Sequence, residues 1–126
     1  MKKITLVVVD DNLVSRLLPG FILRSLSMMA LVLECESGAE AMRLIEVHQI
    51  THVLLDISMP TENGIAVAKK IRSSSKYAGI RLIAYTADVL AMNLDYLKSN
   101  GFDEVLLKPL KRIDLLRALD VIEPCE

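Results

Sequence analysis

The segment Val53-Leu54-Leu55-Asp56-Ile57-Ser58-Met59-Pro60 carries three apolar residues into a lone aspartate, and a proline and Gly64 follow. The apolar run predicts a buried strand that stops at Asp56. A carboxylate at the end of a buried strand is costly unless another group pairs with it. In open parallel sheets this carboxyl edge is also where ligands bind. The rest of the chain must therefore bring partners to the same edge.

Length and composition limit the classes of protein that the chain can represent. The 126 residues are 52% hydrophobic and 25% charged, which indicates one globular domain. Net charge is −1, so no basic excess points to nucleic acid, and the apolar runs are too short to cross a membrane. The N-terminal apolar run is too short for a signal peptide, and we expect a cytoplasmic location. Cys35 and Cys125 form no metal or redox motif.

Apolar strands alternate with amphipathic segments along the whole chain. Strands are predicted over 4–9, 31–33, 53–55, 80–85 and 102–107. Helices are predicted over 13–27, from Ser37 onward, from Asn63–Gly64 to about Arg72, over 89–99 and over 112–121. Such alternation indicates an α/β sandwich with a parallel sheet and right-handed crossovers.

The first predicted helix contains a local conflict. Asp11 or Asn12 is a suitable N-cap, and the apolar face is predicted to comprise Val14, Leu18, Phe21, Ile22 and Leu26. Pro19 lies inside this helix and removes the hydrogen bond to the carbonyl of Ser15. A kink or a local irregularity is therefore expected near Ser15.

Five chemically active side chains are predicted to meet at the carboxyl edge of the sheet. They follow the first, third, fourth and fifth strands and are Asp10, Asp11, Asp56, Thr86 and Lys108. The second strand ends in no comparable chemistry, which places it outermost and favours the strand order 2-1-3-4-5.

The charges at this edge imply a bound cation. Three carboxylates packed together repel one another, and Lys108 supplies a single positive charge. Oxygen ligands without His or Cys favour Mg²⁺, with Mn²⁺ as the alternative. An aspartate beside a divalent cation, a lysine and a hydroxyl is suited to phosphoryl transfer.

From Lys2 to about Val121 the chain resembles the receiver domain of two-component response regulators. The run Val9-Asp10-Asp11-Asn12, with Ser15-Arg16 just beyond, resembles receivers found in hybrid histidine kinases. The resemblance implies a flavodoxin-like (βα)5 three-layer sandwich, with residues 1–126 forming a single receiver domain. It implies that Asp56 is the phosphoacceptor. The implied metal ligands are Asp10, Asp11, Asp56 and the backbone carbonyl of Ser58. The implied phosphate-binding and switch groups are Thr86, the backbone amide of Ala87 and Lys108, and the Lys108–Pro109 peptide bond is expected to be cis.

The resemblance also implies a mode of action. A histidine kinase or histidine phosphotransfer protein donates the phosphoryl group, and a downstream effector protein responds to the changed surface. The domain catalyses only its own phosphorylation and dephosphorylation and is not an enzyme in the usual sense. A phosphorylation-dependent homodimer is left open, and output is expected through a partner protein or a parent chain.

One departure from the family pattern leaves an alternative open. Many receivers carry Tyr or Phe three residues before the lysine, where this chain has Val105. Tyr85 is not expected to substitute, since strand alternation points it away from Thr86. A degenerate receiver that acts as a constitutive binding module is therefore the first alternative. A Mg²⁺-dependent phosphohydrolase is disfavoured by the adjacent Asp10-Asp11 pair, and a nucleotide- or flavin-binding relative by the lack of a Gly-rich loop.

Overall fold

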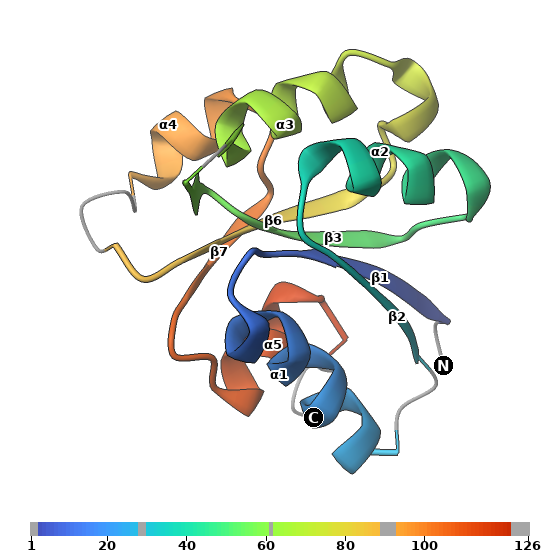
Figure 1. Cartoon of the computed structure of the whole chain (residues 1–126), viewed down its shortest axis with the longest axis vertical. Coiled ribbons are helices and arrows are strands. Elements are labelled where there is room, and N and C mark those ends of the chain that lie inside the picture. The colour runs from blue at the N-terminus through green and yellow to red at the C-terminus, as the bar shows by residue number, and fades with distance from the viewer. Residues whose placement is uncertain (1–2, 28–29, 61, 89–92, 122–126) are drawn as a thin grey trace, which may run out of the picture.

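The computed structural model describes residues 3–27, 30–60, 62–88 and 93–121. A twisted parallel sheet forms the middle layer, with α1 and α5 on one face and α2, α3 and α4 on the other (Figure 1). The helices are α1 (Leu13–Ser25), α2 (Gly38–Val47), α3 (Gly64–Arg72), α4 (Leu94–Ser99) and α5 (Arg112–Ala118), with a short 3-10 turn, η1, at Ser75–Tyr77. The predicted three-layer α/β class, of the flavodoxin-like type, is confirmed.

The sheet has the strand order β2-β1-β3-β6-β7, and all its neighbouring strands are parallel. Its strands are β1 (Ile4–Val9), β2 (Ala30–Cys35), β3 (His52–Asp56), β6 (Arg81–Thr86) and β7 (Glu104–Leu107). In order of appearance these are the five predicted strands, so the predicted order 2-1-3-4-5 is confirmed. A small antiparallel pair, β4 (Ser58–Met59) and β5 (Glu62–Asn63), was not predicted and follows directly after Asp56.

Side-chain caps explain where several helices begin. Asn12, one of the two predicted caps of α1, accepts the N–H of Ser15 at 3.0 Å. Ser37 caps α2 by accepting the N–H of Glu40 at 3.2 Å. The helix predicted over 89–99 begins only at Leu94, because the extended residue Asn93 is its cap. Residues 89–92 lie outside the described part of the chain.

The predicted apolar face of α1 is wrong in two positions. Val14 is 72% exposed and Phe21 is 64% exposed, and both lie on the solvent side. Ile22 is buried as predicted, together with Pro19, Gly20 and Leu23. A Cβ at Gly20 would lie 3.5 Å from the Val32 side chain, an ordinary contact distance, so α1 packs on β2 at this position.

Pro19 does not interrupt α1, which runs from Leu13 to Ser25. The helix is thus continuous through the position where a kink or a local irregularity was predicted, and what differs there is the partner of one carbonyl. The proline has no N–H to offer the Ser15 carbonyl, and this carbonyl accepts the hydroxyl of Tyr85 from β6 at 3.3 Å.

The amino edge of the sheet is closed by the C-terminal helix. His52, at the start of β3, lies with Nε2 2.8 Å from the carbonyl oxygen of Leu119, just after α5. Its Nδ1 lies 2.7 Å from Oγ1 of Thr51, which bonds to the backbone of Thr5 in β1. The beginning and the end of the described chain therefore meet at this edge.

Candidate functional site

Three carboxylates converge at the carboxyl edge of the sheet. Asp10 and Asp11 follow β1, and Asp56 is the last residue of β3. Since β1 and β3 are adjacent parallel strands with Val9 opposite Leu55, their carboxyl ends meet. One ligand oxygen from each aspartate lies within 4.8 Å of the others. Asp10 is 0% exposed and Asp56 is 4% exposed, whereas Asp11 reaches solvent.

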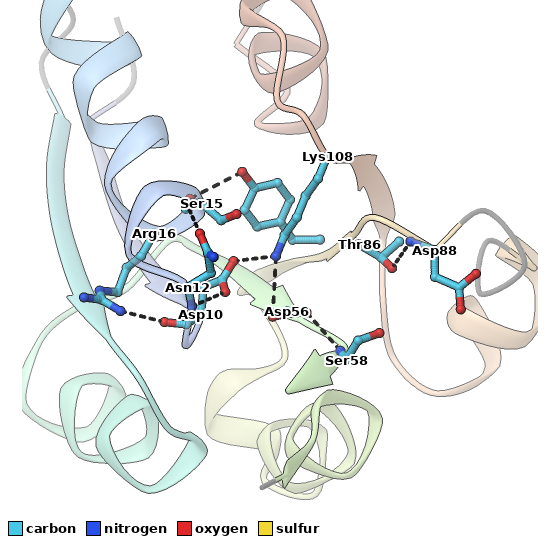
Figure 2. A network of polar contacts seen from close by, with 10 residues as sticks. Asp10, Asn12, Ser15, Arg16, Asp56, Ser58, Thr86, Asp88 and Lys108 are labelled. Carbon is cyan, nitrogen blue, oxygen red and sulfur yellow. Dashed lines mark hydrogen bonds and ion pairs between the residues drawn. The ribbon is translucent and has the colours of Figure 1, made fainter. Parts of the chain in front are cut away.

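Lys108 brings a positive charge to this cluster from the end of β7. Its Nζ lies 2.8 Å from Oδ2 of Asp10 and 3.5 Å from Oδ2 of Asp56 (Figure 2). The ammonium also lies 4.8 Å from the centroid of the Tyr85 ring. The Lys108–Pro109 peptide bond is cis. The lysine thus reaches both buried carboxylates and an aromatic face.

Backbone turns fix the inner oxygen of each buried aspartate. Oδ1 of Asp10 accepts the N–H of Asn12 at 2.9 Å, and Oδ1 of Asp56 accepts the N–H of Ser58 at 2.9 Å. Such turns are typical of aspartate where a strand ends. The Oδ2 atoms are left to face Lys108. Oδ2 of Asp10 is buried and accepts no hydrogen bond, although Lys108 lies beside it.

The surroundings of Asp56 disfavour its charged form. Burial raises the pKa of Asp56, and the charge of Asp10 raises it further. The N–H of Ser58 and the ammonium of Lys108 act in the opposite direction. A hard cation placed among these oxygens would relieve both the burial and the repulsion. The oxygen-only donor set, with three carboxylates against a single lysine, therefore fits a divalent ion.

Thr86 lies on the other side of Asp56 from Asp10 (Figure 2). It is the last residue of β6 and is fully buried, and its Oγ1 accepts the N–H of Asp88 at 2.9 Å. The carbonyl of Thr86 accepts the N–H of Lys108 at 2.8 Å, which ties the ends of β6 and β7 together. Ala87, whose amide is the remaining predicted group, follows directly and is exposed.

The structure therefore brings together the side chains that the sequence placed at this edge, and two contacts were missed. Arg16 donates to the carbonyl of Asp10 at 3.0 Å, and Tyr85 lies under Lys108. Pro19 indicates a Ser15 carbonyl without a helical partner, which the Tyr85 hydroxyl fills, but nothing in the sequence places Lys108 over the Tyr85 ring. Val105, at the position of the usual aromatic residue, is half-buried against the core on the side of α2, α3 and α4.

Comparisons with known proteins agree with this geometry. The family model described as "Response regulator receiver domain" matches residues 6–120. The chain is 31% identical over 112 residues to the CAI-1 autoinducer sensor kinase/phosphatase CqsS of Vibrio cholerae, covering 88% of this chain and 16% of that protein. It is 32% identical over 120 residues to chemotaxis protein CheY1 of Helicobacter pylori, covering 93% of this chain and 94% of that protein. The first curated relatives are much longer proteins, of which this chain spans less than half.

Solved structures give the same result. The receiver domain of sensor histidine kinase PA1611 from Pseudomonas aeruginosa, described with a magnesium ion coordinated in its active-site cleft, has a TM-score of 0.79 and 28% identity, covering 94% of this chain and 96% of that one. CheY4 of Vibrio cholerae has a TM-score of 0.84 over 97% of this chain and all of that one, at 21% identity, and supports the fold. Receiver domains of this type are not classical enzymes. With the acidic edge, the lysine and the family match together, this chain belongs to the response regulator receiver domain family.

Proposed function

We propose that Asp56 accepts a phosphoryl group from the phosphohistidine of a histidine kinase or histidine phosphotransfer protein. The observation that carries the proposal is the Lys108 ammonium, shared between Asp10 and Asp56 at 2.8 and 3.5 Å. An Asp56 oxygen attacks phosphorus, the phosphorus–nitrogen bond breaks, and its electron pair stays on the imidazole. Lys108 offsets the negative charge of the phosphoryl oxygens during the transfer.

The acidic cluster is the part of the site suited to a magnesium ion. Asp10, Asp11, Asp56 and the Ser58 carbonyl would hold Mg²⁺, with Mn²⁺ as the alternative, and the ion would add positive charge near the transferred group. In this proposal Thr86 and the Ala87 amide bind the phosphoryl oxygens once Asp56 is modified. In this proposal the domain catalyses only its own phosphorylation and later hydrolysis.

The added charge is proposed to act as a switch on protein binding. Reorientation of Thr86 toward the phosphoryl group alters the surface formed by α4, β7 and α5, which an effector protein reads. A homodimer formed on phosphorylation is one form this output can take. In this proposal residues 1–126 make one receiver domain that works in the cytoplasm.

The donor protein is proposed to dock on α1. Exposed apolar side chains line its solvent side at Leu13, Val14, Leu17 and Phe21, and this helix lies beside the acidic edge (Figure 2).

Among residues 3–27, 30–60, 62–88 and 93–121, no helix has the length and hydropathy needed to cross a bilayer.

Intact-mass measurement after incubation with acetyl phosphate tests the phosphoacceptor directly. We expect one phosphoryl adduct that needs Mg²⁺, is lost in base and is absent from Asp56→Asn. Asp95→Asn, an exposed aspartate in the first turn of α4, is the matched control and should still be labelled. An adduct that persists in Asp56→Asn, or none in the native protein with a competent donor, would contradict the proposal.

A further inference from the structure

Tyr85 makes two contacts that the phosphoacceptor chemistry does not require. Its side chain is 1% exposed, its ring lies 4.8 Å from the Lys108 ammonium, and its hydroxyl donates to the Ser15 carbonyl at 3.3 Å. An aromatic face attracts a cation placed over it. Tyr85 therefore adds a third contact to a lysine that otherwise bridges Asp10 and Asp56.

The acceptor of the tyrosine hydroxyl exists because of Pro19. In a regular helix the N–H of residue 19 would bond to the carbonyl of Ser15, and proline has none to give. A buried hydroxyl and a carbonyl without a helical partner each need a hydrogen bond. The hydroxyl of Tyr85 and the carbonyl of Ser15 satisfy each other. The proline that removes one helical hydrogen bond from α1 therefore also provides the acceptor that holds Tyr85.

These contacts form a closed circuit between α1 and the acidic site. Ser15 donates its N–H to Asn12, and Asn12 donates its own to Oδ1 of Asp10. Asp10 pairs with Lys108, which lies over Tyr85, and Tyr85 returns to the Ser15 carbonyl. Figure 2 shows Ser15, Asn12, Asp10 and Lys108 in this arrangement. The first turn of α1 and the ammonium are therefore held by a common set of contacts.

We propose that Tyr85 is a positioning residue that holds the Lys108 ammonium at the acidic cluster and couples its placement to helix α1 through the Ser15 carbonyl. The effect on phosphoryl transfer rests on the proposed function of Asp56, whereas the placement of Lys108 does not. Val105 stands where the family usually has an aromatic switch, so Tyr85 is the aromatic side chain that reaches this site among the described residues.

Three substitutions separate the ring, the hydroxyl and the helix. Tyr85→Leu removes the ring, Tyr85→Phe removes only the hydroxyl, and Pro19→Ala gives the Ser15 carbonyl a helical N–H that competes with Tyr85. Tyr96→Phe, on the exposed Tyr96 of α4, is the matched control for loss of a tyrosine hydroxyl.

The first readout is the NMR shift of the ε-methylene protons of Lys108 in the unphosphorylated protein. The Tyr85 ring should move them upfield, Tyr85→Leu should abolish this shift, and Tyr85→Phe and Pro19→Ala should reduce it. An unchanged shift in correctly folded Tyr85→Leu overturns the placement. This readout is independent of whether Asp56 is ever phosphorylated.

The second readout is phosphorylation by acetyl phosphate with Mg²⁺. We expect Tyr85→Phe to lower the maximal rate by about fivefold, the equivalent of one net hydrogen bond, with the half-saturating concentration unchanged. In the Pro19→Ala background, Tyr85→Phe should have a much smaller effect, because its acceptor is already engaged. Fully additive effects, or a native rate in both Tyr85 variants, overturn the coupling, whereas an unlabelled native protein contradicts only the proposed function.

Discussion

Lys108 lies closer to Asp10 than to Asp56, with Nζ 2.8 Å from the first carboxylate and 3.5 Å from the second. One ammonium therefore serves two buried carboxylates unequally, while Asp11 adds a third negative charge nearby. Asp56, the proposed acceptor, is the less neutralised of the two. This imbalance determines how substitutions at the site should affect stability with and without a divalent cation.

Replacement of Lys108 by methionine should destabilise the protein in buffer without divalent ions. Methionine keeps the aliphatic part of the side chain that packs on Tyr85, but Asp10 and Asp56 lose their counter-charge. We therefore expect the free energy of unfolding to fall by about 2–3 kcal/mol. Urea denaturation with and without MgCl₂ measures it, with Lys69→Met on the exposed side of α3 as control. Mg²⁺ should restore much of the loss, so an equal loss in both buffers would argue against the cation site.

Replacement of Asp56 by asparagine should instead raise the melting temperature without Mg²⁺, by a few degrees. The reason is that burial and Asp10 raise the pKa of Asp56 above its usual 3.8, so the ionised form destabilises the fold. As the pH falls, the folded protein takes up this proton before the unfolded chain does. Protonation of Asp56 therefore stabilises the native protein on acidification. The difference in melting temperature between the native protein and Asp56→Asn should shrink toward pH 4. Thermal melts across this range measure the difference, and a constant or widening gap would contradict the assignment.

A methyl group at Gly64 should damage the backbone around Asp56. A Cβ there would overlap the carbonyl oxygen of Asp56 and the Cα of Ile57, and backbone cannot move away cheaply. We expect Gly64→Ala to destabilise by about 1–3 kcal/mol and to slow labelling by acetyl phosphate. Gly79→Ala is the matched control, because a Cβ at Gly79 meets nothing within 4 Å. Equal behaviour of the two variants would show that the close approach is unimportant.

Arg72 joins α3 to the segments that lead into β6 and β7. Its guanidinium donates to the carbonyls of Gly101 at 2.9 Å and Tyr77 at 3.1 Å, and pairs with Asp103 at 2.8 Å. Loss of several such bonds at once should cost about 2 kcal/mol in Arg72→Ala. Arg72→Lys should recover only part of this, because an ammonium cannot reproduce the planar set of donors. Chemical denaturation distinguishes them, and full recovery by lysine would mean that charge alone matters.

Cys35 should stay unreactive while the protein is folded. Burial raises the pKa of its thiol to about 12, so the thiolate is scarce at pH 8. In a Cys125→Ser background, labelling of Cys35 by Ellman's reagent should be slow in buffer and fast in a urea concentration that unfolds the protein. Fast labelling in native buffer would show that the end of β2 opens readily.

The sequence predicted the edge of the sheet better than it predicted the surface of α1. Asp10, Asp56 and Lys108 follow apolar strand runs, and parallel strands bring their ends together whatever the exact boundaries are. Val14 and Phe21 were placed on the wrong side because α1 also carries apolar side chains on its solvent side, and periodicity alone does not tell that side from the buried one. The small β4–β5 pair was missed because two-residue strands carry no periodicity.

The Tyr85 contact shows a further limit of reading a sequence. Strand alternation correctly sends Tyr85 away from Thr86, and the ring is buried with the residues that α1 and α5 cover. The sequence does not reveal that Lys108 lies over that ring, because the contact depends on the course that the lysine side chain takes from the end of β7 toward β6. Such contacts depend on three-dimensional packing between elements distant in sequence.

The closure at His52 and Leu119 has a practical consequence for handling this domain. Since β1 starts beside Thr51 and α5 ends against His52, both ends of the described chain lie at the pole opposite Asp56. A fluorescent protein, surface tether or neighbouring domain attached at either end would leave the acidic edge open to a donor protein. A single domain can therefore be immobilised or fused at both ends and still be assayed for phosphoryl transfer.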